Sequence, residues 1–141
     1  MIPDPNDPRG ARAIARLERE RIGWLTTVTP EGQPQTLPVW FVWQDDELVV
    51  YGDRRAKRNA NLAANQRVTI HLDTSPGGDD VVSIEGLARI DADYPRIPAN
   101  PAYLAKYGEW IDAQLGGPES MAAVYDRPIR IRPTRAVISS E

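Results

Sequence analysis

Short apolar runs, separated by turn-forming residues, divide most of this chain into predicted β-strands. These runs cover residues 24–28, 35–44, 48–51, 68–72, 81–91 and 128–133. In several of them apolar and polar residues alternate, which is typical of a strand with one buried face. No helix of crossover length separates the first three strands. The pattern therefore predicts a compact antiparallel barrel and not a doubly wound fold.

Four other stretches have helical features. They begin at Ala11, Arg54, Pro101 and Pro118. The first is amphipathic and is expected to cover an end or an edge of the barrel. The third has Asn100 as its N-cap and ends at the glycine pair 116–117. Residues 1–10, rich in proline and aspartate, are expected to form a flexible leader, and residues 11–141 a single domain.

Glycine and proline mark two special positions within the predicted strands. Pro38 lies inside the strongly apolar strand 35–44. Because proline has no backbone N–H, it indicates an edge, a bulge or an opening where backbone groups are free. Gly86, in strand 81–91, is a candidate β-bulge.

The segment between strands 48–51 and 68–72 is the strongest candidate for a binding site. Gly52 allows a tight exit from the strand, and Asp53 is a suitable N-cap for a helix that starts at Arg54. Such a helix would place Arg54, Lys57, Arg58 and Asn61 on one face and alanines 56, 60, 63 and 64 against the sheet. Clustered cations repel each other unless a counter-charge is bound. The segment therefore predicts an anion site, most plausibly for phosphate, with a merely solvated basic face as the alternative.

Composition narrows the possible chemistry. The chain has 141 residues, 20 acidic against 17 basic, with no cysteine and a single histidine, His71. Thiolate and histidine-rich metal sites are excluded, so redox chemistry would have to come from a bound cofactor. Neither a GxGxxG nor a P-loop motif is present, which disfavours those nucleotide sites. No apolar run reaches membrane-spanning length and no signal peptide is evident, so a cytoplasmic location is expected.

The order of elements carries a family resemblance, together with the segments LTTVTPEGQPQTLPVWF, YGDRRAKRNANLAANQRVTIHLD, GDDVVSIEGLARI and RIRPTR. The chain resembles the pyridoxamine-5′-phosphate-oxidase-like split β-barrel superfamily, and within it the group of F420 (deazaflavin)-dependent oxidoreductases. The resemblance implies a mainly β (α+β) fold: a six-stranded antiparallel split β-barrel with a short inserted basic helix and flanking helices. It also implies a homodimer with the cofactor site at the subunit interface.

The resemblance further implies which residues bind the cofactor. Family members hold the cofactor phosphate through a basic residue shortly before an Asn-Leu or Asn-Ile pair, here Asn61-Leu62, which leaves Lys57 and Arg58 as alternatives for the main contact. Arg55, Lys57, Arg58 and Asn61 would hold the anionic part, Tyr51 and Gly52 would shape the pocket floor, and Pro38, Val39, Trp40 and Phe41 would line the ring. For Trp40, packing in the core or in a dimer is an equal alternative.

The function implied is hydride transfer between F420 and a small organic substrate, with no catalytic side chain and no metal. One alternative is an FMN-binding flavin reductase or oxidase of the same fold. Another is a carrier that binds F420 without turnover. Binding of single-stranded nucleic acid is the least favoured function, because the sequence pI is near 5.2 and the basic patch is small.

Overall fold

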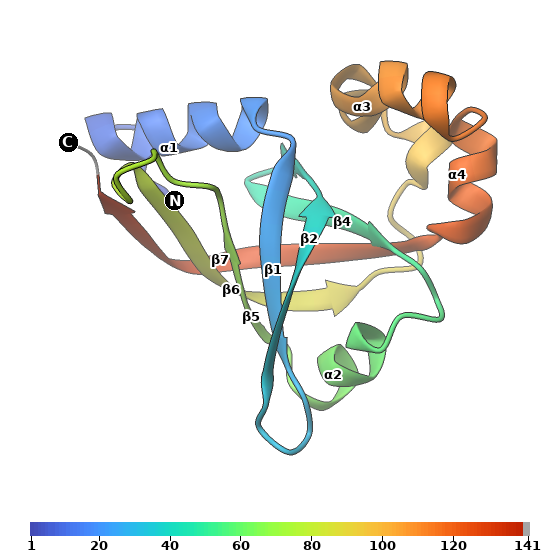
Figure 1. The fold of residues 1–141 in the computed structure, drawn as a ribbon, viewed down its shortest axis with the longest axis horizontal. Helices are drawn as coiled ribbons and strands as arrows, with labels where there is room; N and C mark the ends of the chain where they lie inside the picture. The colour runs from blue at the N-terminus through green and yellow to red at the C-terminus, as the bar shows by residue number, and fades with distance from the viewer. Residues whose placement is uncertain (140–141) are drawn as a thin grey trace.

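The computed structural model describes residues 1–139, and their strands form one antiparallel sheet (Figure 1). The strands are β1 (Ile22–Val28), β2 (Pro34–Trp40), β3 (Val42–Gln44), β4 (Glu47–Gly52), β5 (Arg67–His71), β6 (Val81–Ile90) and β7 (Arg127–Ser139). Their order across the sheet is β2-β1-β5-β6-β7-β4-β3. The antiparallel, mainly β fold class is confirmed, with seven strands in the described residues where the sequence predicted six.

The additional strand arises because the predicted strand 35–44 is broken at Phe41. Its first part, β2, pairs with β1, and its second part, β3, pairs with β4. These two strands are the two edges of the sheet, so a single residue joins one edge to the other. The sheet consequently curls into a half-barrel that is held together at Phe41 and open away from it. Of the alternatives that Pro38 indicated, an edge strand is the one present.

Helices lie around this half-barrel (Figure 1). They are α1 (Pro8–Arg19), α2 (Arg58–Ala64), the 3₁₀ helix η1 (Ile97–Ala99), α3 (Pro101–Gln114) and α4 (Pro118–Val124). In α1, Ala13 and Leu17 pack into the main core, which confirms its predicted role as a cover. Asn100 caps α3 as predicted, since its side chain accepts a hydrogen bond from the Tyr103 N–H. No helix within residues 1–139 is both long and apolar enough to cross a membrane.

Two of the predicted helix starts differ from the structure. Helix α1 begins at Pro8 because Asp7 caps it by accepting a hydrogen bond from the Arg9 N–H. It therefore takes in the last three residues of the segment assigned to a flexible leader. Helix α2 begins at Arg58, four residues later than predicted.

Strand β4 separates two hydrophobic clusters. Leu48 and Val50 face the main core inside the half-barrel, whereas Val49 and Tyr51 face a second cluster beneath η1, α3 and α4. Every residue of β4 is buried, which explains why this strand is continuously apolar in the sequence. Helices α3 and α4 are thus fixed to the back of the strand that leads into the basic segment.

The irregularity predicted at Gly86 is present, but the extra residue lies in the partner strand: Glu85 pairs with Arg135 and Gly86 with Pro133, which leaves Thr134 of β7 without a pairing partner. The pairing between β6 and β7 shifts register between Glu85 and Gly86. A Cβ atom at position 86 would lie 2.7 Å from the carbonyl oxygen of Arg132, so only glycine fits at this crossing. The bulge lets the two longest strands bend around the core.

Candidate functional site

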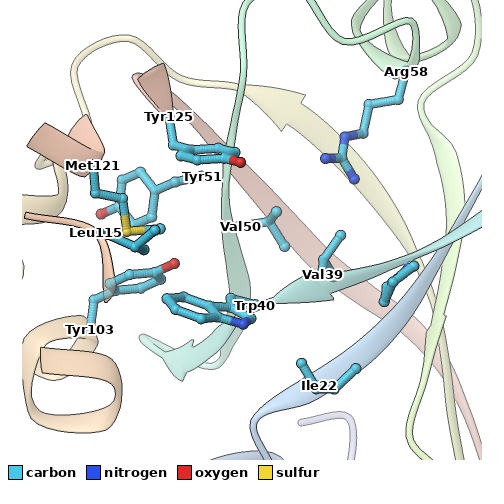
Figure 2. Close-up of a pocket in the computed structure, with 11 residues that line it drawn as sticks. Ile22, Val39, Trp40, Val50, Tyr51, Arg58, Tyr103, Leu115, Met121 and Tyr125 are labelled. Carbon is cyan, nitrogen blue, oxygen red and sulfur yellow. The ribbon is translucent and has the colours of Figure 1, made fainter. Parts of the chain in front are cut away.

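A cavity of about 390 Å³ lies between the edge strand β2, strand β4 and helices α3 and α4 (Figure 2). Five of the predicted site residues line it: Pro38, Val39, Trp40, Tyr51 and Arg58. Pro38, Val39 and Trp40 come from β2, and Tyr51 comes from β4. The structure therefore brings half of the predicted set together around one space.

Six further lining residues were not predicted from the sequence: Ile22, Val50, Tyr103, Leu115, Met121 and Tyr125. Four of them belong to α3 and α4 or to the residues that directly follow these helices. Their apolar and aromatic side chains carry no motif, and their relevance follows only from the packing of α3 and α4 beside β4. The tyrosines in this segment were the one usable signal, since a hydroxyl on an otherwise apolar helix face often contacts a ligand.

Arg58 supplies the positive charge of the cavity. Figure 2 shows its guanidinium group pointing into the cavity from the start of α2. Its Nε atom is buried and has no hydrogen-bond partner among the described residues. Burial lowers the pKa of Arg58, although the nearby Tyr125 opposes this shift. A desolvated cation with an unused donor is a favourable contact for an anionic group.

The walls of the cavity are flat and apolar. The indole ring of Trp40 stacks on the ring of Tyr107, with centroids 4.5 Å apart and planes within 2° of parallel. Trp40 therefore packs against the second cluster and also borders the cavity, so its packing role and its lining role coexist. Such rigid aromatic walls suit a planar ring system.

Comparison with known proteins shows the family to which this chain belongs. The family model described as pyridoxamine 5′-phosphate oxidase matches residues 11–136, nearly the whole chain. The chain belongs to this family. No curated protein matches the sequence.

Solved structures extend the family assignment. A protein described as an F420 reductase is 28% identical, with 87% of this chain and 94% of that chain covered and a TM-score of 0.66. An FAD-binding protein from Mesorhizobium loti, 19% identical over 89% and 90% of the two chains, has a TM-score of 0.63. The heme storage protein HutZ from Vibrio cholerae is 15% identical over 94% of both chains, with a TM-score of 0.63. The last two share the fold.

The structure corrects the prediction that Arg54, Lys57, Arg58 and Asn61 share one face of a helix. The Asp53 carboxylate does not cap a helix but accepts hydrogen bonds from the backbone and guanidinium N–H groups of Arg55. These bonds lower the pKa of Asp53 to about 2 and stabilise a turn at residues 53–55. Arg54 pairs with Asp126 at 2.9 Å, and Lys57 is exposed. Arg58 is the member of this group that reaches the cavity.

Asn61 has a structural role in addition to any contact with a ligand. Its side chain is 4% exposed, and its Nδ2 donates hydrogen bonds of 3.0 Å to Thr27 Oγ1 and to Gln35 Oε1. Asn61 and Leu62 face the barrel, whereas alanines 60, 63 and 64 are exposed. The expectation that the alanines pack against the sheet is therefore wrong. A polar anchor and one leucine attach this short helix instead.

Phe41 and Gly52 lie beside the cavity lining but are not part of it. Phe41 is completely buried; its N–H donates to the Tyr107 hydroxyl at 2.9 Å, and its C=O accepts from Lys106 Nζ at 2.9 Å. The opening with free backbone groups, one of the alternatives that Pro38 indicated, is therefore not found at Phe41. Gly52 ends β4, where a Cβ atom would lie 3.0 Å from Ile129 Cδ1.

Proposed function

We propose that this protein is an F420-dependent oxidoreductase. The observation that carries the proposal is the buried, unpartnered Nε of Arg58 at one end of an aromatic cavity. The family assignment and the 28% identity to an F420 reductase over most of both chains support it. A bound deazaflavin supplies the hydride chemistry itself, so the protein has to bind it, orient it and exclude water.

The residues present fit a deazaflavin. Val39, Val50 and Trp40 offer a flat apolar surface for the ring, and Arg58 lies at the end where the anionic chain would leave it (Figure 2). Next to Arg58 in the sequence, the exposed Lys57 adds positive charge outside the cavity, whereas the charge of Arg55 is paired with Asp53. A long, repeatedly charged tail would pass beside Lys57.

Among the described residues the cavity lining contains no carboxylate and no histidine. His71, on β5, is not part of it. General acid–base catalysis by such groups is therefore not built into the cavity of this chain. Cofactor-based hydride transfer is compatible with this lining, because it depends on positioning.

We also infer that a second copy of this chain completes the site. Exposed apolar side chains surround the cavity, including Ile22, Leu115 and Tyr125 on its lining and Leu37 on the adjacent edge strand. Leu37 is 60% exposed, and a mostly exposed edge strand with apolar residues is usually covered by a partner. Sedimentation equilibrium should give twice the monomer mass, and a monomer at micromolar concentration would contradict this inference.

Titrations of the purified protein with F420 and with FMN, followed by fluorescence polarisation, test the cofactor assignment. We expect tighter binding of F420, because the exposed Lys57 next to Arg58 adds a positive charge for its longer anionic tail. Tighter binding of FMN would support the flavin-dependent alternative, and binding of neither would overturn the proposal. Oxidation of reduced F420 by a panel of quinones and enones then separates an enzyme from a carrier, since a carrier binds F420 without turnover.

A further inference from the structure

The second hydrophobic cluster contains three buried tyrosines whose hydroxyl groups differ in their hydrogen bonds. The Tyr51 hydroxyl donates to the carbonyl oxygen of Pro95 at 2.5 Å and accepts from Asn100 Nδ2 at 2.9 Å. The Tyr107 hydroxyl accepts from the Phe41 N–H and donates to the Arg21 carbonyl oxygen at 2.6 Å. Both of these hydroxyls are thus committed to structural bonds.

The Tyr103 hydroxyl is the exception. The Tyr103 side chain is 1% exposed and lines the cavity, and Figure 2 shows its oxygen directed into the cavity. Within residues 1–139 this oxygen has no hydrogen-bond partner, and Asn100 contacts Tyr103 through the Tyr103 backbone N–H. Because this hydroxyl opens into the cavity and is not used by the protein, a ligand atom bound there can accept its hydrogen bond.

The position of Tyr103 separates it from the anion end of the cavity. Figure 2 shows Arg58 and Tyr103 at opposite ends, with Val50 and Trp40 between them. Leu115 and Met121 border the cavity at the Tyr103 end. Among the described lining residues Arg58 is the one charged side chain, so the Tyr103 end is uncharged and mainly apolar. Such an end disfavours an anionic ligand and fits an uncharged one with a carbonyl group.

We propose that Tyr103 donates a hydrogen bond to the carbonyl oxygen of an uncharged, planar acceptor such as a quinone or an enone. This inference rests on the proposed function, because the acceptor would be bound beside the cofactor ring. The acceptor would gain a hydride from the reduced cofactor and a proton from water, and the oxidised cofactor would release one proton to water, so that two electrons pass from the cofactor to the acceptor. The bond to Tyr103 would withdraw electron density from the carbonyl and stabilise the developing negative charge on its oxygen.

The surroundings keep Tyr103 a donor. Burial raises the pKa of Tyr103 above its ordinary value, and the neighbouring Tyr107 and Tyr51 add to the shift. The hydroxyl therefore retains its proton throughout the neutral range. A fixed, protonated donor in a dry cavity is the arrangement that carbonyl polarisation requires.

Tyr103→Phe tests the proposal with two probes of the same ring skeleton, 2-methyl-1,4-naphthoquinone and 2-methylnaphthalene. Dissociation constants are measured by equilibrium dialysis on protein loaded with F420. We expect the variant to bind the quinone about 3- to 10-fold more weakly, as one lost hydrogen bond predicts, and the hydrocarbon unchanged. The matched control is Tyr94→Phe, whose hydroxyl bonds to Asp45 and whose side chain does not line the cavity. It should alter neither constant.

Two results would overturn the proposal. The first is an equal loss of affinity for both probes, or no loss for either, in Tyr103→Phe. The second is weaker binding of F420 itself by Tyr103→Phe with quinone affinity unchanged, which would assign the hydroxyl to the cofactor. If wild-type protein fails to bind F420, the proposed function fails separately, and the comparison of the two probes on the unloaded protein still decides whether Tyr103 recognises a carbonyl.

Discussion

The ammonium group of Lys106 lies 3.8 Å from the centre of the Phe41 ring and donates a hydrogen bond of 2.9 Å to the Phe41 carbonyl oxygen. Its Nζ also donates to the Leu17 carbonyl oxygen. Helix α3 is thereby attached to the residue that joins the two edge strands and to the end of α1. This side chain therefore links α1 and α3 to the point where the half-barrel is held together.

The free energy of unfolding should depend on pH because the Lys106 ammonium group is buried. Burial lowers the pKa of Lys106 from 10.5 to about 8, an effect that Arg21 reinforces and Glu20 opposes. Between these two values the unfolded chain binds more protons than the folded one, so the free energy of unfolding should rise with pH in this window. Below pH 8 the cost of the buried charge is fully present. Urea unfolding at pH 7.5 and 9.5 should show this rise in wild type.

Lys106→Met is the control for that measurement, because methionine fills a similar space without a titrating group. Its free energy of unfolding should lack the wild-type rise between pH 7.5 and 9.5. A rise of the same size in both proteins would show that another group is responsible. The comparison stops at pH 9.5 because the raised pKa of Tyr107 begins to oppose the effect at higher pH.

Single substitutions should separate the contributions of Arg58 and Lys57 to cofactor binding. Arg58→Ala should weaken F420 binding by about 10- to 100-fold, since a partly buried, charge-assisted bond is worth about 1.5–3 kcal/mol. Lys57→Ala should weaken it less than about 5-fold, because Lys57 is exposed and its interactions are screened. Fluorescence polarisation measures both constants, and the reverse order would place the phosphate outside the cavity.

Asn61→Ala should destabilise the protein by about 1–3 kcal/mol, because it removes the bonds to Thr27 and Gln35 that anchor α2. Asn65→Ala at the end of the same helix is the matched control, as its side chain makes one exposed bond to the Arg67 N–H. Urea unfolding should show a smaller loss for it. Equal losses would mean that the buried bonds of Asn61 are not what secures α2. Titration of folded Asn61→Ala with F420 also tests the predicted contact of Asn61 with the cofactor.

Gly86→Ala should destabilise the protein by about 1–3 kcal/mol, because the new Cβ would lie 2.7 Å from the Arg132 carbonyl oxygen and force the bulge to shift. Gly108→Ala in α3 is the contrasting control. A Cβ there meets nothing within 4 Å, so alanine should stabilise the helix by about 0.5–1 kcal/mol. Thermal unfolding of the two variants should therefore move in opposite directions. A common direction would contradict the close packing described at the bulge.

The sequence predicted the barrel well because its strands are marked by local patterns. Alternating residues, the proline at position 38 and the glycine at position 86 each have a meaning that depends on near neighbours. The break at Phe41 could not be predicted in this way, because the Tyr107 hydroxyl that binds its N–H is 66 residues away. The Phe41 N–H bonds to the Tyr107 hydroxyl and not to a neighbouring strand. The predicted strand is therefore interrupted at Phe41 and forms two strands.

The candidate site was predicted from its charges but not from its apolar wall. Arg58 was identified because it belongs to a basic cluster, yet Asp53 and Asp126 pair with its neighbours Arg55 and Arg54. Tyr103, in contrast, appears in the sequence as an ordinary aromatic residue at helical spacing. Its importance follows from the packing of α3 beside β4, which leaves its hydroxyl facing a space. Helix packing of this kind depends on side chains distant in sequence.

The position of β4 between two separate hydrophobic clusters has a consequence for how this scaffold can change over generations. Mutations in residues 97–124 alter one wall of the cavity and the second cluster, while the interior of the half-barrel keeps its own set of contacts. New ligand preferences can therefore arise by exchanging lining residues of this helical segment without rebuilding the sheet, provided that Lys106 and Tyr107, which bind the Phe41 backbone, are kept. The sheet can therefore stay constant while the helical segment varies. This makes residues 97–124 the natural target for directed evolution.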